Sequence, residues 1–184
     1  MSKIVDFYLG KYRHPATGLT IEEMWKWDNT RLAGMHGYTV WWFPTRKNAT
    51  SIDWEPITDE DIQAFKANPE LRRRLLTSFY RMLDFYGLEV DKSSKTPSIK
   101  RSEDYQERKE VWVTSDNQNF RRISRILQSL MLLGFKDAAE IFLAALVPIY
   151  FENQRTIGLT TYDFWTLSVS DPHYWNGTRD PSPV

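Results

Sequence analysis

The sequence has no cysteine. It also has no net charge, because its 24 Lys and Arg are balanced by 24 Asp and Glu. The lack of cysteine excludes disulfide bonds, thiolate zinc sites, iron–sulfur clusters and a cysteine nucleophile. The charge balance leaves no global field that would draw the chain to nucleic acid or to an anionic membrane. Nucleic acid is therefore disfavoured as a partner.

Long apolar runs are also lacking. The longest, "IFLAALVPIYF", begins at Ile141, contains Pro148, and is shorter than the ~18 apolar residues that suggest a membrane span. The N-terminal residues lack the long apolar core of a signal peptide. We therefore expect a cytoplasmic protein without a membrane span.

The common catalytic and cofactor-binding motifs are absent. The sequence contains no GxxxxGK[ST], GxGxxG, HExxH or GxSxG motif and no EF-hand loop. Its histidines are His14, His36 and His173, and none has a second histidine three or four residues away. From these patterns we predict no catalytic residue, no metal ligand and no cofactor.

What the sequence does contain is a series of helix signals. Capping boxes at Thr20 and Ser115, an acidic first turn after Thr58, and Asn68-Pro69 mark helix starts, and Gly87 and Gly134 mark helix ends. Apolar residues recur at spacings of three and four between these signals. The pattern predicts helices over 20–27, 58–67, 69–86, 103–112, 115–134, 136–152 and 160–169.

The predicted fold is all-α, with six to eight helices in one compact domain and antiparallel, bundle-like packing. We expect this domain to cover residues 1–170 and an irregular, Pro-rich tail to cover 171–184. The polar stretch 89–100 is expected to be an exposed loop. Pro148 should kink or divide its helix, and Val111–Val113 is the best strand candidate, although it is short.

The segment "HGYTVWWFP", His36–Pro44, is unusually aromatic. Tyr38, Trp41 and Trp42 lie at helical spacing, and the turn that they form has no polar side. Burial in the core is favoured because each aromatic ring buries about 150–250 Å². A wall facing a ligand remains the alternative. The unperturbed pKa of a histidine lies near physiological pH, so His36 is a candidate acid or base. A hydrogen-bonded structural role beside the tryptophans is the favoured alternative.

Arginines gather at two places, Arg72–Arg74 and Arg121, Arg122 and Arg125. The second group lies on and beside one face of a helix whose opposite face is apolar. Guanidinium groups suit phosphate or carboxylate recognition. A solvated face, or salt bridges to acidic neighbours, is the structural alternative, and we favour it.

Several blocks, in order along nearly the whole chain, resemble the conserved region of the opioid growth factor receptor family. They are "HGYTVWWFP", "PITDEDIQAF", "RMLDFYGL", "RSEDYQER", "NFRRISRILQSLMLLGF" and "DFWTLSV". The family pattern has Gln and Leu where this sequence has Val40 and Trp42. The His that often precedes the Asn of the arginine helix is Gln118 here.

The resemblance implies a helical domain, and vertebrate members are described as receptors for an enkephalin-type peptide. It transfers no catalytic residue, and the chain is expected to be a minimal member without the C-terminal repeat region. The leading hypothesis is a non-catalytic binding module for a peptide, a small molecule or a protein partner. The predicted binding residues are His36, Tyr38, Trp41, Trp42, Arg101, Asn119, Arg122 and Arg125.

Two other classes of function stay open. An enzyme would use His36 with an arginine or carboxylate that the fold brings within hydrogen-bond reach. Binding of a nucleotide or nucleic acid would require the two arginine groups to form one exposed patch. The exposure of His36, Trp41, Trp42 and the arginines separates these hypotheses.

Overall fold

The computed structural model describes residues 2–46, 56–93, 95–175 and 178–179, and within them it is mainly helical. Eleven α-helices are described there, six of which have eight or more residues, so the predicted helical class is confirmed. The chain divides into two compact units, residues 1–82 and 83–184. The single domain expected over 1–170, and the tail after it, stay predictions.

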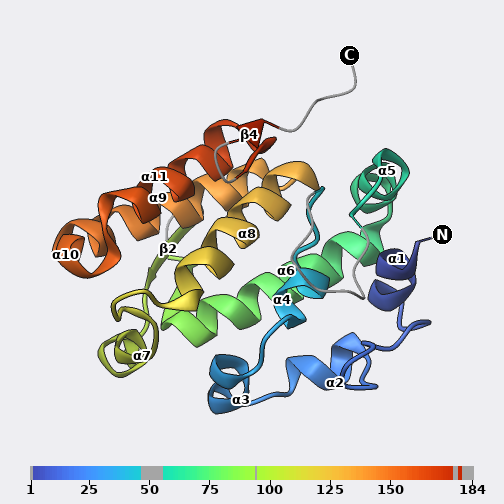
Figure 1. The fold of residues 1–184 in the computed structure, drawn as a ribbon, viewed down its shortest axis with the longest axis horizontal. Coiled ribbons are helices and arrows are strands. Elements are labelled where there is room, and N and C mark those ends of the chain that lie inside the picture. Colours follow the sequence, from blue (N-terminus) through green and yellow to red (C-terminus); the bar gives the residue numbers. More distant parts are fainter. Residues whose placement is uncertain (1, 47–55, 94, 176–177, 180–184) are drawn as a thin grey trace. The chain divides into compact units, whose positions relative to one another are not determined.

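The N-terminal unit consists of five short helices and most of the longer α6 (Figure 1). Many of its buried side chains are aromatic. Both expected caps at its helix starts are present, because the Thr20 and Thr58 side chains each accept from the backbone amide three residues on. The Asn68 side chain likewise accepts from Glu70 N at 2.9 Å. The helices are α1 Lys3–Tyr8, α2 Ile21–Trp25, α3 Asn29–Gly34, α4 Tyr38–Trp42, α5 Asp59–Ala67 and most of α6 Pro69–Tyr86.

The C-terminal unit is built on three helices that pack against one another, α8 Gln118–Leu132, α9 Lys136–Glu152 and α11 Leu159–Ser170. Successive members run in opposite directions, which agrees with the antiparallel packing predicted (Figure 1). α9 continues through Pro148 without division. The remaining elements are α7 Tyr105–Trp112, α10 Gln154–Ile157, β1 Leu88–Asp91, β2 Ser98–Arg101, β3 Tyr174–Trp175 and β4 Thr178–Arg179.

The loop predicted over 89–100 was wrong, because its two ends form an antiparallel hairpin. Leu88 pairs with Arg101 and Asp91 pairs with Ser98. Strands of four residues place only two side chains on each face, so alternation is too brief to predict a strand. A second short hairpin, β3 with β4, lies in the tail that was expected to be irregular.

Three local assignments are also corrected. The N-cap of α8 is Asn117, whose side chain accepts from Asn119 N at 2.9 Å, and not Ser115. The last helix starts at Leu159 after Gly158 instead of at a threonine cap. The strand candidate 111–113 is the end of α7. Ser115 and Asn117 are both favourable N-cap residues, so local propensity does not choose between them.

Gly87 joins α6 to β1 in a left-handed conformation, with φ of 72°. A Cβ atom at this position would lie 2.8 Å from Tyr105 Cα and 2.9 Å from Arg108 Cβ. We expect Gly87→Ala to lower the free energy of unfolding by about 2–4 kcal/mol, since both conformational strain and a backbone clash oppose it.

Urea unfolding of Gly87→Ala, followed by tryptophan fluorescence, measures this loss. Gly37→Ala is the matched control, because Gly37 has φ of 83° but open space where its Cβ would lie. It should show only the conformational cost of about 1–2 kcal/mol. Equal losses in the two variants would contradict the close approach at Gly87.

Candidate functional site

The aromatic signature segment forms α4, and its side chains are buried. Tyr38, Trp41 and Trp42 are 0%, 4% and 0% exposed. The Tyr38 ring packs edge-on against Trp42, with centroids 5.1 Å apart, and against Trp27 at 5.8 Å. The Tyr8 hydroxyl donates to the Trp42 carbonyl oxygen. This part of the segment is therefore core, which was the favoured interpretation of its helical spacing.

Trp41 is enclosed by rings from the N-terminal end of the chain. Tyr12 stacks on it with centroids 5.6 Å apart, while Phe7 and His14 meet it edge-on at 5.3 Å and 5.7 Å. His14 is 4% exposed, and its Nδ1 has no hydrogen-bond partner in the described part of the chain. The histidine that packs on the aromatic signature is thus His14.

The histidine predicted from the sequence as a binding residue was His36, because it is adjacent to the aromatic segment. His36 is exposed in the structure. No ionisable side chain within the described ranges forms a hydrogen bond or ion pair with it. The enzyme hypothesis required such a partner, and the described residues supply none. No local signal marks His14, which lies far from Trp41 in sequence.

Burial lowers the pKa of His14, since the aromatic surroundings disfavour the charged imidazolium. The unfolded chain then binds a proton more readily than the folded chain, so stability rises with pH below the unfolded pKa of about 6.5. We expect the free energy of unfolding to fall between pH 7.5 and 5.5, by up to about 1.4 kcal/mol per pH unit below 6.5.

His14→Phe should remove this contribution, because phenylalanine keeps the ring contacts and does not titrate. His36→Gln is the control, and it should keep the wild-type pH dependence. Urea unfolding at a series of pH values measures both. An unchanged slope in His14→Phe would contradict the assignment to His14.

The arginine helix, α8, also places its predicted binding residues inside the protein. Asn119, Arg122 and Arg125 are 2%, 6% and 6% exposed. Asn119 Nδ2 donates to Asn117 Oδ1 at 2.8 Å, and Arg122 Nη1 donates to Asn119 Oδ1 at 3.2 Å. Burial lowers the pKa of Arg125 to about 10, so its guanidinium still carries a charge at neutral pH.

The arginines therefore do not provide the exposed patch that the nucleic-acid hypothesis needs. Arg121 is the exposed member of its group. In the other group, Arg73 and Arg74 both donate to the Glu70 carboxylate, and Arg74 also donates to Glu22. These bonds compensate the unfavourable position of cations in the first turns of α6. They fit the structural alternative of salt bridges to acidic neighbours.

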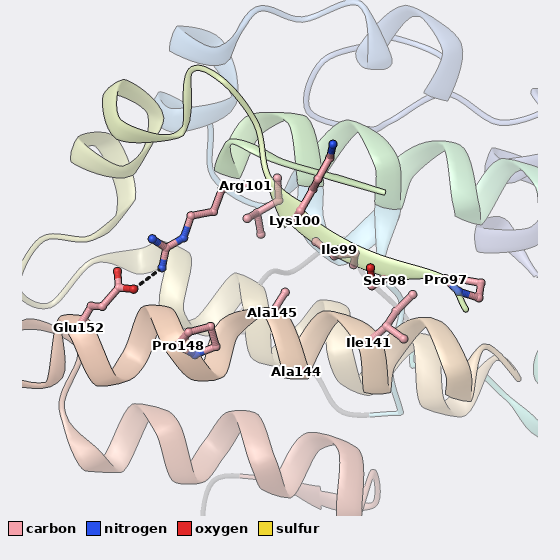
Figure 2. A pocket seen from close by; sticks show the side chains of 11 residues that line it. Pro97, Ser98, Ile99, Lys100, Arg101, Ile141, Ala144, Ala145, Pro148 and Glu152 are labelled. Carbon is pink, nitrogen blue, oxygen red and sulfur yellow. Dashed lines mark hydrogen bonds and ion pairs between the residues drawn. The ribbon is translucent and has the colours of Figure 1, made fainter. Parts of the chain in front are cut away.

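Arg101 is the predicted binding residue that lies in a hollow of the surface. An open groove of about 630 Å³ runs between β2 and α9 in the C-terminal unit (Figure 2). β2 contributes consecutive residues to one side, and α9 contributes an apolar stripe to the other. The lining residues are Leu88, Pro97, Ser98, Ile99, Lys100, Arg101, Ile141, Ala144, Ala145, Pro148 and Glu152.

One end of the groove is charged. Arg101 Nη2 donates to Glu152 Oε1 at 2.6 Å (Figure 2). The guanidinium carbon of Arg101 lies 4.6 Å from the centre of the Tyr105 ring. The bond to Glu152 raises the pKa of Arg101. Both partners of the ion pair are partly exposed, at 35% and 49% of their side chains. The pair is therefore weak enough in water for another carboxylate to compete for Arg101.

Pro148 contributes to the lining of the groove and also alters the backbone of α9. Pro148 lies inside α9 and has no N–H, so the carbonyl oxygen of Ala144 loses its usual donor four residues on. Ala144 and Pro148 are exposed, and both line the groove. Proline thus removes one backbone donor from the part of α9 that lines the groove. The effect expected from the sequence was only a kink or a division of the helix.

The fold and its conserved segments define a class of small helical domain with an aromatic core and an arginine-bearing central helix. Residues 2–175 match the model of the opioid growth factor receptor conserved region. The chain therefore belongs to the opioid growth factor receptor family, which confirms the resemblance inferred from its motifs. No solved structure matches it.

Three relatives show the extent of the similarity. Opioid growth factor receptor-like protein 1 of Xenopus tropicalis is 34% identical over 134 residues, which is 71% of this chain and 26% of the relative. The opioid growth factor receptors of Mus musculus and Homo sapiens are 32% and 31% identical over 151 residues, 80% of this chain. They are covered over 23% and 21% of their own lengths. The chain thus spans about a quarter of the relatives that it matches.

The described residues include neither a membrane-spanning helix nor a metal-binding cluster. No helix among them is both long and apolar enough to cross a membrane. Within the same ranges, no cluster of three or more His, Asp or Glu side chains is arranged to hold a metal ion.

Proposed function

We propose that this chain is a non-catalytic binding module, and that its ligand is a peptide segment, either free or part of a protein partner. The observation that carries the proposal is the groove between β2 and α9. The lining of this groove is largely apolar and includes Arg101, which was predicted from the sequence to be a binding residue. Binding sites in proteins typically join an apolar lining with a few placed polar groups.

The form of the groove favours a peptide over a compact small molecule. Its lining follows the strand over residues 97–101, and its ion pair, Arg101 with Glu152, lies at one end (Figure 2). Such a surface suits an elongated ligand that contacts successive residues. The relatives named as growth factor receptors support the same class of function.

The other predicted binding residues receive different roles in this proposal. His36 is exposed and is available for a contact at the surface of the N-terminal unit. The buried residues are proposed to stabilise the fold instead of touching the ligand, since their side chains have almost no surface to offer. These are Tyr38, Trp41, Trp42, Asn119, Arg122 and Arg125.

A peptide-array screen tests the proposal. An immobilised library of short random peptides is probed with the wild-type protein and with Ala144→Arg, which places a long charged side chain in the groove. Ala144 is exposed and helical, so arginine is compatible with its position. We expect wild type to bind a defined set of peptides and Ala144→Arg to lose most of that set.

Gln106→Arg is the matched control, because it adds the same side chain at an exposed position of α7 that does not line the groove. It should bind the wild-type set. The proposal fails if wild type retains no peptide. It also fails if Ala144→Arg retains the same peptides as Gln106→Arg.

A further inference from the structure

We propose that the groove binds an acidic, extended peptide by adding it as a third strand to the outer edge of β2. This inference rests on the proposed function and specifies the mode of binding and the chemistry of the ligand. It depends on the hydrogen-bonding register of the hairpin, on the residues that line the groove, and on the charge of the strand.

The register leaves one edge of β2 unpaired. Ser102 N donates to Gly87 O at 2.9 Å, which makes these residues facing partners in the ladder. In an antiparallel ladder, facing pairs that bond to each other alternate with facing pairs that do not. Leu88 with Arg101 is therefore a pair without mutual hydrogen bonds, and Glu89 with Lys100 is the next bonded pair. The amides and carbonyls of Ile99 and Arg101 therefore point away from β1. Among the described contacts, none uses them.

This unpaired edge borders the groove. Five consecutive residues, 97–101, line it, although successive side chains of a strand point to opposite faces. Side chains from both faces of β2 can line the same groove when the groove runs along the backbone edge of the strand. A strand laid there would pair with Ile99 and Arg101 on one side. One face of that strand would then lie against the apolar residues that α9 contributes to the groove.

The side chains define what such a strand should carry. Small apolar residues suit the surface of Ile141, Ala144 and Ala145, where the hollow is shallow. The hairpin, residues 88–101, carries four basic and two acidic residues, and Lys100 is paired with Glu89 at 3.2 Å, so a net positive charge remains. An acidic residue near Arg101 would be attracted to it and would compete with Glu152.

The probe is a fluorescein-labelled peptide Ser-Val-Ser-Val-Glu with blocked ends, together with the reversed sequence, because strand direction is open. Its length matches the four residues of β2 and one flanking position. Fluorescence polarisation with wild type should give saturable binding for one of the two. Replacing its Glu by Gln should weaken binding by about tenfold, as expected for one charged contact.

Arg101→Ala separates the charge contact from a general effect. It should weaken the Glu peptide by about tenfold and leave the Gln peptide nearly unaffected, so that the two changes are not additive. Additive losses would overturn the pairing of the carboxylate with Arg101. Failure of both orientations, with library peptides still bound, would overturn the proposed ligand chemistry while leaving the binding function intact.

N-methylation of the probe tests strand addition directly. In an added strand, alternate amides of the peptide donate to β2, so methylating them should abolish binding, while methylating the others should have little effect. Amide hydrogen exchange at Ile99 and Arg101 should also slow when the peptide binds. Uniform tolerance of N-methylation, or unchanged exchange at both amides, would overturn strand addition.

Ile99→Pro removes one edge donor from the protein itself. The Ile99 amide points away from β1, so proline leaves the β1–β2 ladder bonded. Binding should fall by about tenfold in Ile99→Pro and stay near wild type in Ile99→Val, which keeps the N–H. If Ile99→Pro does not fold, the N-methyl scan on the wild-type protein decides the question. A total absence of peptide binding to wild type would defeat the proposed function first.

Discussion

Replacing Trp42 by alanine is expected to lower the free energy of unfolding by about 3–5 kcal/mol, the usual cost of removing a large aromatic side chain from a packed core. Trp42 is fully buried and meets Tyr38 edge-on at 5.1 Å. Native domains have only about 5–15 kcal/mol of stability. The loss should therefore be visible as a large shift of the urea midpoint.

Two further variants define the cause of that loss. Trp42→Leu should cost less than alanine, because leucine refills part of the space and the indole N–H has no hydrogen-bond partner in the described structure. His36→Ala, at an exposed position of the same signature segment, should change stability by no more than about 0.5 kcal/mol. A stable Trp42→Ala variant that had lost only ligand binding would contradict the assignment of Trp42 to the core.

Replacing Arg122 by alanine is expected to lower the free energy of unfolding by about 2–4 kcal/mol. The change removes the bond from Arg122 Nη1 to Asn119 Oδ1 and the packing of a side chain that is 6% exposed. The long stem of arginine contributes to burial as well as the charged group. Arg122→Lys should rescue little, since an ammonium group does not reproduce the planar set of donors.

Arg121→Ala is the matched control, one residue away on the same helix but exposed. It should leave the urea midpoint within about 0.5 kcal/mol of wild type. Peptide binding should be unaffected in Arg122→Ala under conditions where the variant is folded. A loss of binding without a loss of stability would show that Arg122 touches the ligand.

The helices could be predicted because their signals are local. Thr20, Thr58 and Asn68 each cap a helix through bonds to amides two or three residues on, and the apolar repeats follow directly. The core position of Trp41 and Trp42 followed from a helical turn without a polar side. The hairpin was missed because four-residue strands carry little alternation, and its pairing joins residues seven to thirteen positions apart.

The candidate site could be predicted only in part. Arg101 was predicted as a binding residue from a family motif. The groove in which it lies is formed by β2 and by a helix about 40 residues later, which the sequence does not show. Pro148 marks where a helix loses an N–H, yet whether that position lines a groove depends on the tertiary packing. The burial of His14 on Trp41 is non-local for the same reason.

The central claim is that ligand binding lies at the groove between β2 and α9, while the aromatic signature of α4 is core. The most direct measurement is amide chemical-shift mapping of the isotope-labelled protein during titration with a peptide that it binds. We predict that the perturbed amides fall at Ile99 and Arg101 and along 141–152. Perturbations centred on His36–Thr45, with those of β2 and α9 unchanged, would contradict the account.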